Sequence, residues 1–213
     1  MKPYGNQKAY IVLKKFISMK SRRSILKSAS INELERTLDK CLVWFYAFPN
    51  SKIGLNDLSK SINSSKTATK EVVESLIEIS FLSRQIIGRS WLISTNQKHP
   101  YFLTKKVPYH LSKIYETGII NAVHQIIPQA RAIILFGSYR WGTDTEESDI
   151  DIAVEVLDNK DLQITQLGII AELGYRKNVP VNLHIFSRNK IDLNLFANIT
   201  NGIVLDGFLE ARP

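Results

Sequence analysis

Two aspartates, Asp149 and Asp151, stand one residue apart at the start of a strand-like segment whose neighbouring residues are apolar. Successive side chains of a strand point to opposite faces, so these two carboxylates share one face, about 6 to 7 Å apart. Mutual repulsion makes such a pair costly unless a cation lies between the carboxylates. The spacing therefore predicts that Asp149 and Asp151 bind one or two divalent metal ions.

A phosphate-binding turn is predicted close to these carboxylates. A strand-like segment ends at Phe136, Gly137 permits a tight turn, and a helix is predicted from Ser138. Backbone N–H groups at a helix start bind phosphate, and the Ser138 hydroxyl adds a donor. Because Mg²⁺ takes one or two carboxylates together with substrate phosphates, the two motifs predict a site for magnesium and a nucleoside triphosphate.

The run Gly137-Ser138, ten further residues and then Asp149-Ile150-Asp151 resembles the signature of the DNA polymerase β-like nucleotidyltransferase superfamily. The likeness is to its small prokaryotic members, the minimal nucleotidyltransferases, and extends over about residues 131–206. The resemblance implies that Asp149 and Asp151 are catalytic and hold two Mg²⁺ ions at the α-phosphate of ATP or another nucleoside triphosphate. It also implies that Gly137 and Ser138 hold the β- and γ-phosphates.

Three positions qualify this resemblance. Members of the superfamily usually carry a third carboxylate on a later strand, and the matching segment VNLHIF has Asn182 there. That carboxylate helps to hold the metal ion that activates the acceptor, so its loss affects catalysis more than nucleotide binding. His184 shares the face of Asn182 and is either a base or ligand, or a packed histidine. Many members have Arg where this chain has Trp141; the preceding Arg140 either reaches a phosphate or belongs to the ordinary surface.

The N-terminal half has a pattern of its own. Helices are predicted over residues 30–48, beginning with a capping box at Ser30, and over 55–62 and 66–79, followed by a hairpin with strands SRQII and SWLIST. Three helices and a hairpin resemble a winged helix-turn-helix, which implies DNA contacts at the recognition helix and the wing. The side chains expected there are Lys66, Thr67, Lys70, Arg84 and Arg89. The alternative is a packing or dimerisation module with a basic face.

These patterns predict an α+β protein with two domains. The expected parts are a basic N-terminal segment (1–29), a winged helix-turn-helix domain (30–99), a linker and connecting helix (100–130) and an α/β nucleotidyltransferase domain with a small mixed sheet (131–213). Within the third part, residues 100–108 are expected to be linker and residues 111–127 one helix. In the fourth, a helix is predicted over residues 161–173, between two strands.

Charge and composition limit the classes of function that the chain can have. The net charge of +8 includes eight basic and no acidic residues over 1–29, a balance of +4 over 30–109 and a balance of −4 over 110–213. This asymmetry predicts that the N-terminal half contacts a polyanion and that the C-terminal half binds cations. The basic N-terminal segment also fits an organelle transit peptide. A single cysteine, Cys41, stands in an apolar run that favours packing and fits a reducing, cytoplasmic location. No apolar run reaches the length of a membrane span.

Three functions compete on this basis. The leading hypothesis is a Mg²⁺-dependent nucleotidyltransferase that moves a nucleoside monophosphate, AMP from ATP, to a hydroxyl of a protein or another acceptor. The family that the chain resembles includes antitoxins that modify a partner toxin of the HEPN type. The alternative is a DNA-binding transcriptional regulator whose nucleotidyltransferase domain only binds or senses nucleotide. Winged-helix modules often act as dimers, so a homodimer is compatible with this alternative. The third is an interaction protein with a decayed site.

Overall fold

The computed structural model describes residues 31–210, so the predictions for the basic segment 1–29 and for the helix cap at Ser30 lie outside the described residues. The chain divides into two compact units, Met1–Tyr101 and Phe102–Pro213. Among residues 31–210, no helix is long and apolar enough to cross a membrane.

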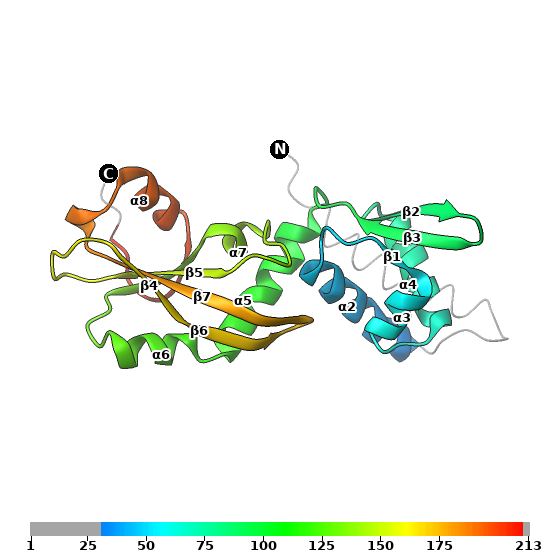
Figure 1. Ribbon diagram of the computed structural model, residues 1–213, viewed down its shortest axis with the longest axis horizontal. Coiled ribbons are helices and arrows are strands. Elements are labelled where there is room, and N and C mark those ends of the chain that lie inside the picture. The colour runs from blue at the N-terminus through cyan, green and yellow to red at the C-terminus, as the bar shows by residue number, and fades with distance from the viewer. Residues whose placement is uncertain (1–30, 211–213) are drawn as a thin grey trace. The chain divides into compact units, whose positions relative to one another are not determined.

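The N-terminal unit combines helices with an antiparallel sheet of strand order β1-β3-β2 (Figure 1). Its described elements are α2 (Ile31–Ala47), β1 (Ile53–Gly54), α3 (Leu55–Ser61), α4 (Lys66–Glu78), β2 (Leu82–Ile87) and β3 (Ser90–Thr95). The three predicted helices and the predicted hairpin are therefore present. Strand β1 was not predicted, because two residues are too few to show a strand period. The assignment to the winged helix-turn-helix class stays a prediction.

Local chemistry explains where α4 begins and which face it buries. The Ser65 hydroxyl accepts a hydrogen bond from the Ala68 N–H at 3.2 Å, which caps the helix. Val72, Val73 and Leu76 are fully buried. On α2, Cys41 is also fully buried, and burial raises the pKa of its thiol. The predicted packing of Cys41 in the core is confirmed.

The C-terminal unit is built on a mixed sheet of strand order β6-β7-β5-β4-β8, in which β5 and β7 are parallel (Figure 1). The strands are β4 (Ala132–Phe136), β5 (Ile150–Glu155), β6 (Gln163–Leu173), β7 (Arg176–Phe186) and β8 (Ile203–Gly207). The helices are η1 (a π-helix, Phe102–Lys106), α5 (Val107–Glu116), α6 (Ile119–Ile126), α7 (Gly137–Trp141), η2 (a 3-10 helix, Arg188–Lys190) and α8 (Leu193–Thr200).

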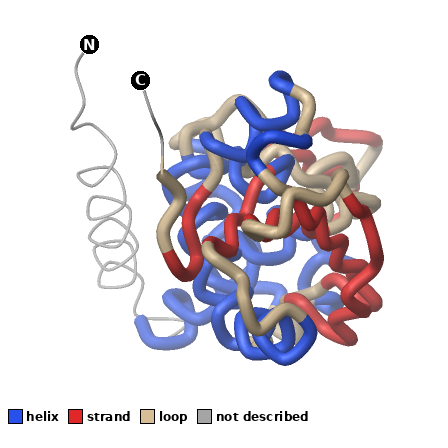
Figure 2. Tube along the Cα trace, turned by 90° about the vertical axis from the view of Figure 1, so that its left-hand side faces the viewer, coloured by secondary structure: helices blue, strands red, loops and turns tan. Residues whose placement is uncertain are grey.

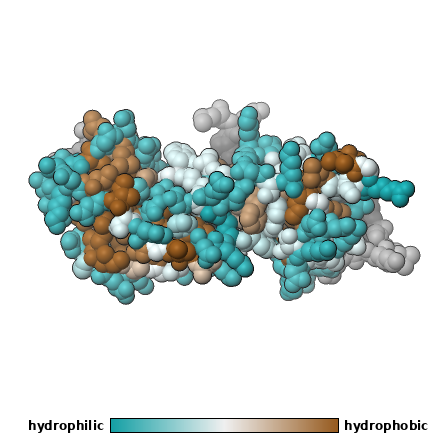
Figure 3. Space-filling view, viewed as in Figure 1, coloured by the Kyte–Doolittle hydropathy of each residue, from teal (hydrophilic) through white to brown (hydrophobic). Residues whose placement is uncertain are grey.

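Helices cover both faces of this sheet, as Figures 1 and 2 show. One face packs against α5 and α6 through a core that includes Ile114, Val123 and Ile152. The other face packs against α8 through a smaller core that includes Phe186 and Ile199. The small mixed sheet of the predicted fold class is present. Apolar side chains also reach the surface of the molecule (Figure 3).

The predicted helix over residues 161–173 is wrong: this segment forms the edge strand β6, antiparallel to β7. A register shift between Gln166 and Gly168 leaves Leu167 as an extra residue, and Leu167 and Ile170 both pack against the core. The bulge thus gives a strand an apolar spacing of three, which imitates a helix. Gly174, at φ +63°, opens the two-residue hairpin turn that joins β6 to β7.

The segment before the sheet also differs from its prediction. The single helix expected over residues 111–127 is two helices, because Gly118 adopts φ +75° between α5 and α6. The expected linker over residues 100–108 is largely helical. Pro108 lies in the first turn of α5, which continues directly from the π-helix η1. This proline therefore belongs to a helical segment rather than to a linker.

Candidate functional site

The predicted carboxylates lie at the start of β5, with Asp149 directly before the strand and Asp151 within it. Ile150, Ile152 and Val154 are buried in the core on the α5–α6 side of the sheet. Alternation therefore directs Asp151 toward the opposite face, where Ala153 packs in the smaller core. The predicted separation of an apolar face from a carboxylate face is confirmed.

The glycine turn lies directly beside one of these carboxylates. Strand β4 pairs with β5 so that Phe136 stands opposite Asp151, and α7 begins at the next residue, Gly137. Gly137 adopts φ +69°, and a Cβ added there would lie 2.6 Å from Asp151 Oδ2. Only glycine allows this approach. The two motifs, separate in sequence, therefore meet in the fold.

Strand β7 supplies two side chains that pair with the aspartates. The Asn182 side-chain amide donates a hydrogen bond to Asp149 Oδ2, and His184 Nε2 lies 3.2 Å from Asp151 Oδ1. The His184 ring also packs edge-on against Phe136, with ring centroids 4.9 Å apart. Asp151 and His184 are 24% and 14% exposed, so the pair is reachable from solvent. Asn182 thus serves as a donor to Asp149.

These residues fit a metal ion that is held together with a nucleotide. Among residues 31–210, no group of three or more His, Cys, Asp and Glu side chains is arranged to hold a metal ion by itself. Two carboxylates and substrate phosphates, however, are an ordinary donor set for Mg²⁺. The approach of Asp151 to the Gly137 turn places a carboxylate where a phosphate on that turn could share its cation. The number of ions stays a prediction.

Two further charged residues near these motifs have structural partners. Arg140 Nε donates to the Asn201 carbonyl at 2.9 Å, and its guanidinium carbon lies 4.2 Å from the Trp141 ring centroid. Arg140 therefore connects α7 to the end of α8. Glu155, at the other end of β5 from Asp151, is fully buried and accepts a hydrogen bond from Arg188 Nε at 2.9 Å.

A buried polar cluster behind the site was not predicted. Lys106 Nζ lies 3.0 Å from Asp144 Oδ1 and donates to the Asp144 carbonyl at 2.6 Å, and both side chains are fully buried. His110 Nδ1 lies 3.5 Å from the same carboxylate oxygen, and the His110 ring packs against Tyr139. Sequence offers no signal for this cluster, because Lys106 falls in a predicted linker and Asp144 in an acidic loop.

Burial dominates the titration of this cluster. It raises the pKa of Asp144 to about 6, although Lys106 acts in the opposite direction. It lowers the pKa of Lys106 and lowers that of His110 to about 3. Lys106 and Arg176 lower the pKa of His110 further through their positive charge. His110 is therefore neutral in the folded protein at neutral pH.

We expect His110→Gln to reduce the acid sensitivity of the C-terminal unit. Below pH 6.5 the unfolded chain protonates His110 while the folded chain does not until about pH 3, so stability is lost as pH falls. Asp144 acts oppositely, because its raised pKa lets the folded chain bind a proton first below about pH 6. Wild type should lose up to about 1.4 kcal/mol per pH unit relative to the variant. Calorimetry at pH 7.5, 6 and 4.5 checks this; parallel stability profiles would contradict it.

Comparison with known proteins agrees with the position of these motifs. Residues 119–206, from α6 into β8, match the family described as "Polymerase beta, Nucleotidyltransferase". The chain is also 43% identical over 51 residues to protein adenylyltransferase MntA of Shewanella oneidensis, which covers 24% of this chain and 37% of that protein. The match thus spans well under half of that relative. Together, these findings support a transferase and the assignment of residues 119–206 to the polymerase β-like nucleotidyltransferase superfamily.

Proposed function

We propose that the C-terminal unit is a metal-dependent nucleotidyltransferase that moves AMP from ATP to a hydroxyl group of a protein. The approach of Asp151 Oδ2 to the Gly137 turn carries the proposal, because it puts a metal-binding carboxylate beside a phosphate-binding backbone. The name of the similar Shewanella oneidensis protein, a protein adenylyltransferase, supports AMP and a protein acceptor.

Each motif has a defined part in this proposal. The N–H groups after Gly137 and the Ser138 hydroxyl bind the β- and γ-phosphates, which leaves the α-phosphate near Asp149 and Asp151. The acceptor oxygen attacks the α-phosphorus, the bond to pyrophosphate breaks, and the hydroxyl proton is released. Asp149 and Asp151 would hold Mg²⁺, which would neutralise charge on the phosphates and lower the pKa of the acceptor hydroxyl. His184 holds Asp151 in place through their 3.2 Å contact.

Labelled nucleotides test the proposal directly. The protein is incubated with Mg²⁺ and each of the four α-³²P nucleoside triphosphates, alone and with the product of the neighbouring gene. A small helical neighbour of the HEPN type would make this chain an antitoxin that modifies its toxin. We expect label from ATP on a protein. Mg²⁺-dependent nucleotide binding without label transfer would favour a unit that only senses nucleotide, and absence of both would contradict the proposal.

Asn182→Asp should increase transfer, by about tenfold, because it places a third carboxylate beside Asp149. The substitution replaces the amide that now donates to Asp149 Oδ2, so its benefit should require saturating metal. Transfer rates measured over a Mg²⁺ titration check this result, with Asn178→Asp, on the exposed start of the same strand, as control. A fall in rate at every metal concentration would instead show that the donor at residue 182 is needed.

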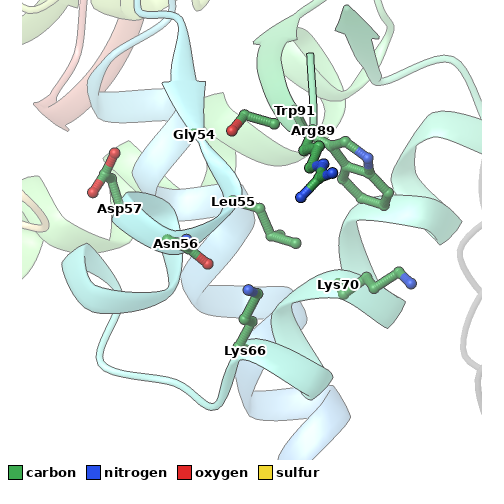
Figure 4. Close-up of a pocket in the computed structure, with 9 residues that line it drawn as sticks. Gly54, Leu55, Asn56, Asp57, Lys66, Lys70, Arg89 and Trp91 are labelled. Atoms are coloured by element: carbon green, nitrogen blue, oxygen red, sulfur yellow. The ribbon is translucent and has the colours of Figure 1, made fainter. Parts of the chain in front are cut away.

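A second candidate function is nucleic-acid binding by the N-terminal unit, as in a DNA-binding regulator whose C-terminal unit senses nucleotide. A pocket of about 350 Å³ between α3, α4 and the β2–β3 hairpin supports it. Lys66 and Arg89 extend toward each other across this pocket, and Trp91 lines it (Figure 4). Lys70 Nζ lies 5.7 Å from the Trp91 ring centroid. Cations beside an aromatic ring are typical of nucleic-acid contacts.

The other two DNA-binding candidates lie close to this pocket. The guanidinium carbon of Arg84 is 4.4 Å from the Trp91 ring centroid. Thr67 is exposed in the first turn of α4. Lys66, Lys70 and Arg89 therefore line one pocket together with Trp91, Arg84 also packs on Trp91, and Thr67 occupies the start of the helix. This arrangement supports the winged helix-turn-helix as a proposal for residues 30–99.

Reversing two pocket charges tests this second function. Lys66→Glu/Arg89→Glu should weaken binding of a fluorescent duplex and lower the slope of log affinity against log salt concentration by about two, because two phosphate contacts are lost. Fluorescence anisotropy between 50 and 300 mM salt provides the measurement. Lys98→Glu, an exposed charge outside the pocket, is the control. Equal affinities and slopes for all three proteins would exclude the pocket as a nucleic-acid site.

A further inference from the structure

Arg176, the first residue of β7, belongs to neither motif but contacts the segments that carry both. Nη1 of its guanidinium group donates a hydrogen bond to the Tyr139 hydroxyl, and Nη2 donates one to the Ser148 carbonyl. Tyr139 follows Ser138 on α7, and Ser148 directly precedes Asp149. A single side chain, 6% exposed, therefore links the phosphate-binding turn to the first aspartate.

The loop that ends at Asp149 depends on such contacts for its position. Residues 142–148 form turns but no helix or strand. Within the loop, the Thr145 N–H donates to Ser148 Oγ at 2.9 Å. Lys106 anchors its middle at Asp144, and Arg176 anchors its end at Ser148. These two buried cations join the loop to η1 and to β7.

The chemistry of arginine suits this double contact. Its planar guanidinium is always charged and presents donors in a fixed geometry, so it can serve two acceptors at once. Burial raises the pKa of Tyr139, so the phenol stays neutral, and its oxygen accepts a hydrogen bond from Arg176. Removal of the guanidinium leaves a buried hydroxyl and a partly buried carbonyl without this donor.

We propose that Arg176 is a positioning residue that holds the Gly137–Ser138 turn and Asp149 at the separation required by a metal–nucleotide complex, a role that rests on the nucleotidyltransferase function proposed above. Its burial keeps it from the nucleotide, so it acts through Tyr139 and Ser148. Displacements of about 1 Å can cost about 100-fold in rate at such sites. Loss of the guanidinium should therefore weaken metal binding while the C-terminal unit remains folded.

The test uses Mn²⁺ as a probe, with a non-hydrolysable ATP analogue, on the full chain. Electron paramagnetic resonance gives the affinity for Mn²⁺, and hydrogen exchange gives the protection of the amides over residues 142–149. Arg176→Met should weaken Mn²⁺ binding about tenfold or more. Tyr139→Phe removes one of the two contacts and should have a smaller effect. In Arg176→Met, the loop amides should also exchange faster than in wild type.

Arg188→Met is the matched control. Arg188 is a partly buried arginine just after the end of β7, and its partners are Glu155, at the end of β5 away from Asp149, and Glu210. Removal of the Arg188 guanidinium deprives the buried Glu155 carboxylate of a partner and should destabilise the unit. Mn²⁺ affinity and protection of residues 142–149 should nevertheless stay within about twofold of wild type, because effects of distant sites are independent.

The results separate a failed positioning role from a failed enzymatic function. Equal Mn²⁺ affinity in wild type and Arg176→Met would overturn the positioning role while leaving the transferase intact. Absence of Mn²⁺–analogue binding by wild type would overturn the proposed function instead. In that case the hydrogen-exchange data still test whether Arg176 holds the loop of residues 142–149 in place. Equal protection of the loop amides in Arg176→Met and Arg188→Met would overturn this role, and loss of protection in Arg176→Met alone would support it.

Discussion

Asp151→Asn should reduce nucleotidyl transfer by about 1,000-fold, the largest effect expected of any single substitution in this chain. Asparagine has nearly the same shape as aspartate, but it lacks the negative charge that balances a divalent cation beside the Gly137 turn. Asp151 is 24% exposed and lies 3.2 Å from His184 Nε2, a contact that the amide can replace. We therefore expect a large loss of activity with little change in stability.

Single-turnover transfer of label from α-³²P-ATP, at saturating Mg²⁺, measures this loss. Asp161→Asn is a suitable control, since it removes the same charge from a side chain that is 91% exposed and outside the site. Its transfer rate should equal that of wild type. Activity of Asp151→Asn within tenfold of wild type would place the reactive metal elsewhere and would contradict the proposed site.

Gly137→Val should have the second-largest effect, because it acts on both motifs at once. A Cβ at this position meets Asp151 Oδ2 at 2.6 Å, and φ +69° is strained for a β-branched residue. Either the turn or the Asp151 carboxylate must move, and both movements separate the phosphate-binding N–H groups from the metal-binding oxygen. We expect transfer to fall by at least about 100-fold. The backbone strain alone should lower stability by about 1 to 2 kcal/mol.

Gly118→Val separates these two contributions. Gly118 has a similar φ, +75°, but a Cβ there meets nothing within 4 Å. The control should therefore show the loss of stability without the loss of transfer. Calorimetry and nucleotide binding on both variants, alongside transfer rates, make the comparison. Equal losses of transfer in the two variants would show that strain, and not the approach to Asp151, explains the effect.

Much of the local structure could be predicted because it depends on near neighbours in the chain. The apolar alternation of β5 predicted which face carries Asp151, and Gly137 after an apolar strand predicted the turn. Ser65 similarly caps α4 through an atom three residues away. Each signal spans a few residues, which is the range over which periodicity and turn chemistry act.

The errors arose where a local pattern had two meanings. Leu167 and Ile170 show helical spacing, yet a bulge makes them neighbours on one side of a strand. What decided between helix and strand was pairing with β7, which provides hydrogen bonds that the segment itself does not encode. Pro108 is similarly compatible with a linker or with the first turn of a helix.

The sequence by itself determined the two motifs, their spacing and the faces on which their side chains lie. Only the tertiary structure decided their partners: Asn182 at Asp149, His184 at Asp151, and Arg176 between α7 and the loop before β5. These pairs join residues 28 to 37 positions apart. Their contacts follow from strand register and from burial of charge, and both are properties of the packed fold.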